Sequence, residues 1–309
     1  MLAFLSGGFL GWSLGANDSA NIFGTAVSSR MVSYKKAVIL ISIFVVLGAF
    51  LEGEKGVETL RSVSDMSMRT ATITTLAAAL CVTAMTFFKI PVSTSQAVGG
   101  AIFGMAFLNG TVNYQLFYKM IICWIATPLG GMLITVLLYN CFALLFRLIK
   151  PDIYRQDSWL RFGLVICGCY GAYSLGANNV ANSAMVFTGP EKGMLPVELA
   201  VLLGGLFISL GTITYSKNVM MTVGKGIVQL DAFSAFVSVL AHSITLHLFA
   251  EIGVPVSSSQ AVVGSVIGIS LIKGLHLINY KTLVMVFSGW TATPFIGALL
   301  ALLINHLLK

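Results

Sequence analysis

GANDSAN, residues 15–21, is a polar cluster inside a stretch that has no other charged residue from Met1 to Val27. The cluster recurs as GANNVAN at residues 176–182. Two more motifs recur in the same order, PVSTSQA (91–97) as PVSSSQA (255–261) and WIATP (124–128) as WTATP (290–294). The offsets are 161, 164 and 166 residues. Motifs that repeat in order at a nearly constant offset indicate an internal duplication.

The duplication predicts two similar halves. We expect the first repeat at residues 1–150 and the second at residues 161–309. Residues 151–160 form the longest clearly polar stretch, and we expect them to be a connector between the repeats.

The composition indicates a membrane protein. The mean hydropathy is +0.92, with 57% hydrophobic and 9% charged residues, which is far above the range of soluble domains. Apolar stretches recur ten times, at 2–27, 37–51, 70–88, 92–108, 115–148, 160–189, 197–214, 231–250, 255–272 and 281–308. Because a helix needs about 20 residues to cross a membrane, we predict an all-α integral membrane protein. We expect about ten transmembrane or re-entrant helices in two inverted repeats of five.

The basic residues indicate the topology. An odd number of crossings in each half inverts the second half relative to the first. With this arrangement, 12 of the 18 Lys and Arg residues fall on the side opposite the N-terminus. By the positive-inside rule that side is cytoplasmic, so we predict a multi-pass protein of the plasma or inner membrane with both termini outside. The net charge of +7 then reflects contact with the lipid bilayer, and we expect no nucleic-acid partner.

The serine-rich motifs have the spacing of capping boxes. Ser93 with Gln96, and Ser257 with Gln260, are expected to satisfy backbone N–H groups reciprocally at a helix start. The helices that follow, about 96–108 and 260–272, would be only ~20 Å long and are expected to be half-helices. Two half-helix N-termini that meet at depth would suit a tetrahedral oxyanion. The alternative is a pair of well-capped helices in interfacial loops. The candidate anion-binding residues are Ser93, Thr94, Ser95, Gln96, Ser257, Ser258, Ser259 and Gln260.

The Asn/Asp motifs offer carboxylate and amide oxygens, which are ligands for Na⁺ or part of a proton pathway. An unpaired carboxylate at Asp18 would cost several kcal/mol in a membrane, so a cation, a proton or close donors must accompany it. The alternative is an Asx turn that breaks a helix for packing alone. The candidate cation-coupling residues are Asn17, Asp18, Asn21, Asn178, Asn179 and Asn182, of which Asp18, Asn21 and Asn182 are the candidate Na⁺ ligands.

Other features carry less chemistry. His242 and His247 lie five positions apart in an apolar stretch, and we expect hydrogen-bonded core or interface histidines rather than a proton relay. The sequence contains neither a phosphate-binding P-loop motif nor an HExxH motif, and it offers no recognisable nucleophile and base pair. We therefore expect no enzyme activity and no cofactor apart from a coupling Na⁺ or H⁺.

These motifs resemble the PiT family of inorganic phosphate transporters, whose two halves carry a GANDxAN motif and a later PVSTT-type motif. The segment TVGKGIVQLDAFSAF at residues 222–236 extends the resemblance over nearly the whole chain. The resemblance implies an inverted-repeat symporter in which the Ser/Thr motifs hold phosphate and the Asn/Asp motifs hold the coupling cation. Asn179 replaces the second aspartate of the family pattern, and Gln96 and Gln260 stand where many relatives have histidine.

The sequence therefore predicts a symporter of inorganic phosphate coupled to Na⁺ or H⁺. A sulfate symporter is the first alternative because some relatives of this family take sulfate. A passive anion channel is the second alternative, although a channel needs no cation site and Asp18 then has no role. A homodimer is a candidate assembly that the sequence leaves open.

Overall fold

The computed structural model describes residues 1–63, 67–87, 92–188, 194–226 and 230–308. Within these ranges the chain is helical and contains no strand, so the fold is all-α. The helices are α1 (Leu2–Ser28), α2 (Tyr34–Glu52), α3 (Glu54–Ser62), α4 (Met68–Phe87), α5 (Thr94–Asn109), α6 (Tyr114–Ile149), α7 (Ile153–Asn179), α8 (Ala181–Ala184), η1 (Met185–Phe187), α9 (Val197–Gly226), α10 (Ala232–Ile252), α11 (Ser258–Lys273), η2 (Leu275–Leu277) and α12 (Tyr280–Leu307).

Each of the ten apolar stretches falls mainly in helices, but not all of these helices meet the length and composition of a membrane span. Among the described residues, seven helical segments are long and apolar enough to cross a bilayer. The half-helices α5 and α11 have 16 residues each, which corresponds to about 24 Å. Helix α1 has 27 residues and is not one of the seven, because its polar cluster lowers its mean hydropathy. The protein is therefore a multi-pass membrane protein, and the predicted count of ten spans is not confirmed.

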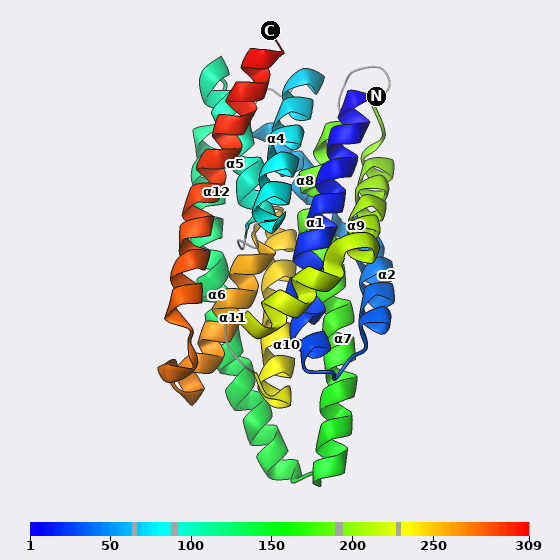
Figure 1. The fold of residues 1–309 in the computed structure, drawn as a ribbon, viewed down its shortest axis with the longest axis vertical. Coiled ribbons are helices and arrows are strands. Elements are labelled where there is room, and N and C mark those ends of the chain that lie inside the picture. Colours follow the sequence, from blue (N-terminus) through cyan, green and yellow to red (C-terminus); the bar gives the residue numbers. More distant parts are fainter. Residues whose placement is uncertain (64–66, 88–91, 189–193, 227–229, 309) are drawn as a thin grey trace.

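The helix contacts follow a repeated pattern. Helix α1 packs along α9 and α2 packs along α7, while α5 packs on α12 and α11 packs on α6. Helix α4 contacts α1, α5 and α12, just as α10 contacts α7, α11 and α6. Both termini lie at one end of the bundle, and the α6–α7 connection lies at the other (Figure 1). Helices α6 and α12, which carry the two copies of the Trp–Thr–Pro motif, run in opposite directions (Figure 1).

Glycines allow two of these helix pairs to approach closely. A Cβ atom on Gly15 would overlap with the carbonyl oxygen of Ile208 in α9. In the same way, a Cβ atom on Gly176 would overlap with the carbonyl oxygen of Val45 in α2. Small residues at such contacts are typical of helix packing in membranes. Gly15 and Gly176 are the first residues of GANDSAN and GANNVAN, so helix packing explains this position of the motif.

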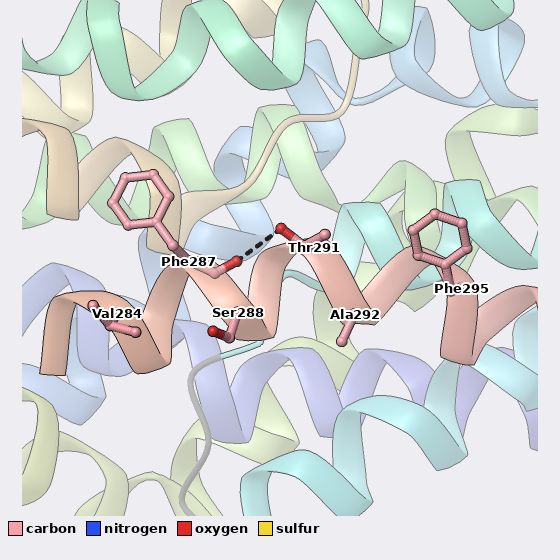
Figure 2. Close-up of a pocket in the computed structure, with 6 residues that line it drawn as sticks. All are labelled: Val284, Phe287, Ser288, Thr291, Ala292 and Phe295. Atoms are coloured by element: carbon pink, nitrogen blue, oxygen red, sulfur yellow. Dashed lines mark hydrogen bonds between the residues drawn. The ribbon is translucent and has the colours of Figure 1, made fainter. Parts of the chain in front are cut away.

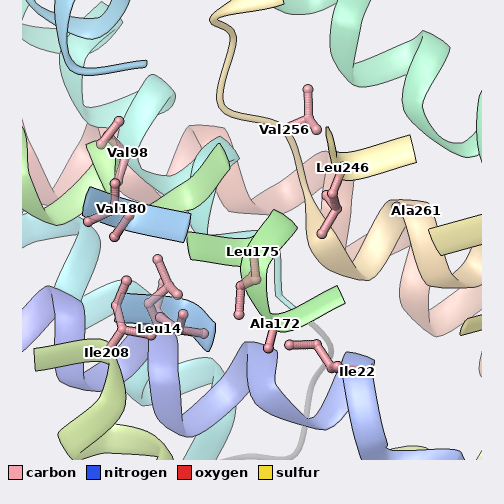
Figure 3. Packing of buried hydrophobic residues seen from close by; sticks show 14 of the residues in the cluster. Leu14, Ile22, Val98, Ala172, Leu175, Val180, Ile208, Leu246, Val256 and Ala261 are labelled. Atoms are coloured by element: carbon pink, nitrogen blue, oxygen red, sulfur yellow. The ribbon is translucent and has the colours of Figure 1, made fainter. Parts of the chain in front are cut away.

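The largest cluster of buried hydrophobic residues draws on helices from both halves of the chain, α1, α7 and α9 among them. Leu14 and Ile22 of α1, Leu175 of α7 and Ile208 of α9 are completely shielded from solvent (Figure 3). By contrast, large apolar side chains cover the outer face of α12, where Leu299 is 66% exposed. An exposed apolar surface of this kind fits the lipid chains of a bilayer.

A cavity of about 610 Å³ lies on the outer face of α12 (Figure 2). Its lining residues follow one another at helical spacing: Val284, Phe287, Ser288, Thr291, Ala292 and Phe295. The hydroxyl of Thr291 is already used, because it donates to the carbonyl oxygen of Phe287 at 3.0 Å. Most of the lining side chains are exposed, so this is an open hollow of the surface, and none of the predicted site residues line it.

Most of the predicted polar connector is part of a helix. Asp152 Oδ1 accepts a hydrogen bond from Arg155 N at 2.9 Å and caps α7, which therefore begins at Ile153. Only residues 150–152 separate α6 from α7, and most of the predicted stretch 151–160 is helical. Outside the hydrocarbon core of the membrane, polar residues can form a helix when its first turn is well capped.

Candidate functional site

The two serine-rich motifs form the starts of α5 and α11. Ser93 Oγ accepts a hydrogen bond from Gln96 N at 3.3 Å, and Ser257 Oγ accepts one from Gln260 N at 3.2 Å. The serine half of each predicted capping box is therefore present. The glutamine half is wrong, because Gln96 Oε1 and Gln260 Oε1 have no hydrogen-bond partner in the described part of the chain. Both oxygens are buried and stay available to a ligand.

Reciprocal hydrogen bonds hold the two helix starts together. Ser95 Oγ donates to Val256 O at 2.8 Å, and Ser259 Oγ donates to Val92 O at 3.1 Å. Each bond joins a hydroxyl of one half-helix to a backbone carbonyl oxygen just before the other. We call the paired helix starts, residues 92–96 and 256–260, the linked tips. The positive ends of two helix dipoles therefore face the same region, which favours an anion.

The first Asn/Asp motif lies in the continuous helix α1 and approaches both tips. Thr94 Oγ1 donates to Asp18 Oδ2 over 3.5 Å, which is the long limit of a hydrogen bond. One helical turn further, Asn21 Nδ2 donates to Ser258 Oγ at 3.2 Å. Asp18 and Asn21 share a face of α1 because they are three positions apart. Asn17 instead donates to Thr86 of α4 at 2.7 Å.

The second motif behaves differently, because α7 ends at Asn179 and the chain continues in the short helix α8. Ser95 Oγ lies 2.9 Å from Asn179 Oδ1 and accepts from Asn182 Nδ2 at 3.2 Å. Asn178 holds the segment before α11: its Nδ2 donates to Val254 O at 3.1 Å, and its Oδ1 accepts from Val256 N at 2.9 Å. Val180, between α7 and α8, keeps a right-handed helical conformation, and its N–H donates to Gly176 O at 3.2 Å. The second copy therefore departs only slightly from the continuous helix of the first.

The structure thus brings four motif residues into side-chain contact with the linked tips. Asp18 and Asn21 come from the first copy, and Asn179 and Asn182 come from the second. Asn17 bonds α4 instead, and Asn178 reaches the second tip only through backbone atoms, since it bonds Val254 O and Val256 N.

Several residues at the linked tips carry buried oxygens without a hydrogen-bond partner. In the described residues, Asp18 Oδ1, Gln96 Oε1, Asn182 Oδ1 and Gln260 Oε1 are all buried and accept no hydrogen bond. Leaving such an acceptor unsatisfied costs about 1–3 kcal/mol each, so a bound species is expected to satisfy them. Carboxylate and amide oxygens are suitable ligands for a hard cation and also suitable acceptors for a protonated oxyanion.

His242 is a contact of the site that sequence reasoning assigned to the core. It is fully buried in α10, and its Nε2 lies 3.1 Å from Ser258 Oγ. The expectation of a hydrogen-bonded core histidine is confirmed, but its partner belongs to the linked tips. Ser258 therefore joins α10 to Asn21 of α1. A histidine in an apolar stretch was the signal, and the sequence could not show its partner.

Comparison with known proteins agrees with this architecture. A model of the phosphate transporter family matches residues 14–160 and 149–301. The chain is 28% identical to a candidate phosphate permease of Methanocaldococcus jannaschii, over 97% of this chain and 95% of the relative. It is 27% identical to a sulfate permease of Bacillus subtilis, over 100% of this chain and 88% of the relative.

A solved structure of a protein named the sodium-dependent phosphate transporter has the same fold. The TM-score is 0.84 with 23% sequence identity, and the match covers 98% of each chain. Since the family model spans most of the sequence, the chain belongs to the phosphate transporter family.

Proposed function

We propose that this protein is a secondary active transporter that carries inorganic phosphate together with Na⁺. The observation that supports this most is the pair of linked tips beside one carboxylate, Asp18. Two helix N-termini favour a doubly charged oxyanion, and hydroxyl and backbone donors replace its water. A cation bound at Asp18 would offset the charge of the anion while both ions cross the membrane.

Sodium suits the unpartnered oxygens better than a proton does. A proton would satisfy only one oxygen of Asp18, whereas a Na⁺ ion takes several oxygen ligands at once. Asp18 Oδ1 and Asn182 Oδ1 are buried acceptors from the two Asn/Asp motifs, and Asn21 contributes a further amide oxygen on the same face as Asp18. The structural neighbour is named as sodium-dependent, which supports the same choice.

Phosphate suits the glutamines better than sulfate does. Phosphate keeps a proton at neutral pH and can donate a hydrogen bond, while sulfate only accepts. The buried oxygens of Gln96 and Gln260 would accept such a bond, and they would face a sulfate oxygen with no hydrogen between them. Sulfate remains the second candidate because a relative of 27% identity is named a sulfate permease.

We also propose that the chain consists of two inverted repeats with both termini outside. The repeated helix contacts, the opposite directions of α6 and α12, and the two segments matched by the family model support this organisation. The excess of basic residues on one side supports the orientation.

Uptake by proteoliposomes tests the proposal. Radiolabelled phosphate and sulfate are offered separately, with and without an inward Na⁺ gradient. We expect phosphate to accumulate above its external concentration only when the gradient is present. Equilibration of phosphate without Na⁺ would instead identify a passive channel, and preferential accumulation of sulfate would identify a sulfate symporter.

A further inference from the structure

A second group of ionisable side chains lies away from the linked tips, between α2 and α10. Glu52 is the last residue of α2, and His247 and Glu251 lie one turn apart near the end of α10. His247 Nε2 is 3.4 Å from Glu52 Oε2 and 3.9 Å from Glu251 Oε1. One ligand atom from each residue lies within 4.8 Å of the other two.

The surrounding residues hold two members of this group in place. Tyr173 of α7 donates its hydroxyl hydrogen to Glu52 Oε1 at 2.6 Å and so directs the other carboxylate oxygen, Oε2, toward His247. The imidazole of His247 lies against the rings of Tyr170 and Tyr173, with centroid distances of 5.4 and 5.8 Å. Within the described chain, Glu52 Oε2 is buried and receives no hydrogen bond.

One of these separations matches tetrahedral coordination, and all three are within 4.8 Å. Ligand atoms that lie ~2.0–2.1 Å from a tetrahedral Zn²⁺ are about 3.3–3.5 Å from each other. The separation between His247 and Glu52 falls in this range, and that between His247 and Glu251 is only slightly longer. A nitrogen ligand with two carboxylates favours Zn²⁺ over Ca²⁺ or Mg²⁺, which prefer six or more oxygens.

We propose that Glu52, His247 and Glu251 form a binding site for Zn²⁺. The three residues supply three ligands and leave a fourth position for water. The side chain of Glu251 is 51% exposed, so the ion can reach the site from the surface. A bound ion would tie α2 to α10, the helix that leads through Gly253 into the second linked tip.

Lys55 competes with the metal for Glu251. Its Nζ lies 2.9 Å from Glu251 Oε2, which draws the carboxylate away from the centre of the group. Loss of the ammonium group would free this oxygen and remove a positive charge near the ion. The Lys55→Met variant should therefore bind Zn²⁺ more tightly than the parent, which a purely structural ion-pair network does not predict.

Calorimetric titration of the purified, detergent-solubilised protein with ZnCl₂ tests the site. The parent carries Cys141→Ser, because Cys141 is an exposed thiol that could bind zinc. We expect one Zn²⁺ per chain and at least tenfold weaker binding by His247→Gln and Glu251→Gln. His306→Gln is the matched control, since His306 is exposed near the end of α12. This variant should bind zinc as tightly as the parent.

Two further variants separate metal binding from structure. Tyr173→Phe removes the hydrogen bond that orients Glu52, and such a loss typically weakens metal affinity about 10–100-fold. Thermal unfolding without zinc shows whether each variant is folded. Glu251 is half-exposed, so the fold should tolerate Glu251→Gln most readily. Absence of saturable binding by the parent, or binding by His247→Gln equal to that of the parent, overturns the proposal.

Discussion

Removal of a hydroxyl from the linked tips should weaken phosphate binding. In Ser95→Ala, Val256 O loses the donor that lies 2.8 Å away, while Asn182 Nδ2 keeps a second acceptor in Asn179 Oδ1 at 3.2 Å. One buried group is thus left unsatisfied, at a cost of about 1–3 kcal/mol. If bound phosphate must hold the separated tips together, most of this cost reduces the free energy of phosphate binding. A loss of ~1.4 kcal/mol raises the dissociation constant tenfold.

Ser259→Ala should have a smaller effect in the same direction, since its bond to Val92 O is longer at 3.1 Å. The double variant should lose less phosphate affinity than the product of the two single fold losses, because the first substitution already separates the tips. Ser270→Ala is the matched control: Ser270 is buried in α11 but donates only to Val266 O of its own helix.

The assay is phosphate titration of the purified variants at a fixed Na⁺ concentration, with thermal unfolding as the measure of folding. The reasoning is refuted if Ser95→Ala and Ser259→Ala bind phosphate as tightly as Ser270→Ala. If the losses of binding free energy in the two single variants add fully in the double variant, the two hydrogen bonds do not act as a unit.

Three other predictions concern the caps, the packing and the topology. Ser93→Ala and Ser257→Ala each remove a helix cap worth about 1–2 kcal/mol, so the half-saturating phosphate concentration in transport assays should rise about 5–30-fold; unchanged values in both would exclude the caps from the site. Gly15→Ala should lower the thermal unfolding temperature, at a cost of ~1–3 kcal/mol, while Gly130→Ala, whose added Cβ has its nearest neighbour at 3.9 Å, should not; equal stability of the two would contradict the close approach of α1 and α9. A cysteine at Gln156 should react with an impermeant reagent in inverted vesicles and not in intact cells, and the opposite result would reverse the orientation.

The positions of most helices could be predicted from the sequence. Apolar stretches of about 20 residues can only be helices in a bilayer, because backbone groups must be satisfied within the segment. The short lengths of α5 and α11 were also predictable, since each follows a capping serine, and Gly110 ends α5 in a left-handed conformation. The start of α7 was missed because Asp152 is a cap in a stretch whose polarity indicates a connector.

The roles of single side chains were less predictable, because they depend on how each helix is rotated. Asn17 and Asp18 are neighbours in one motif, yet only Asp18 faces the tips. Asn17 and Asn178 occupy matching positions in the two copies, but one bonds a threonine and the other bonds backbone. Gln96 and Gln260 have the spacing of a capping box, and spacing alone does not show that their oxygens remain without a partner.

The difference between Asp18 and Asn179 offers the most direct test of cation coupling. An anion that enters against a negative-inside potential loses about 2.3 kcal/mol per charge for every 100 mV, so accumulation requires cations to travel with it. Asp18 is the single acidic residue of the two Asn/Asp motifs. Asp18→Asn nearly preserves the shape of the side chain and removes its charge.

The decisive measurement is phosphate uptake by proteoliposomes as a function of the Na⁺ gradient, for the unchanged protein, Asp18→Asn and Asn179→Asp. Asp18→Asn should remain folded and lose gradient-driven accumulation. Asn179→Asp should keep accumulation and respond at lower Na⁺ concentrations, because it adds a second carboxylate beside Ser95. Full gradient-driven accumulation by Asp18→Asn would show that the aspartate is structural and would contradict the proposed coupling.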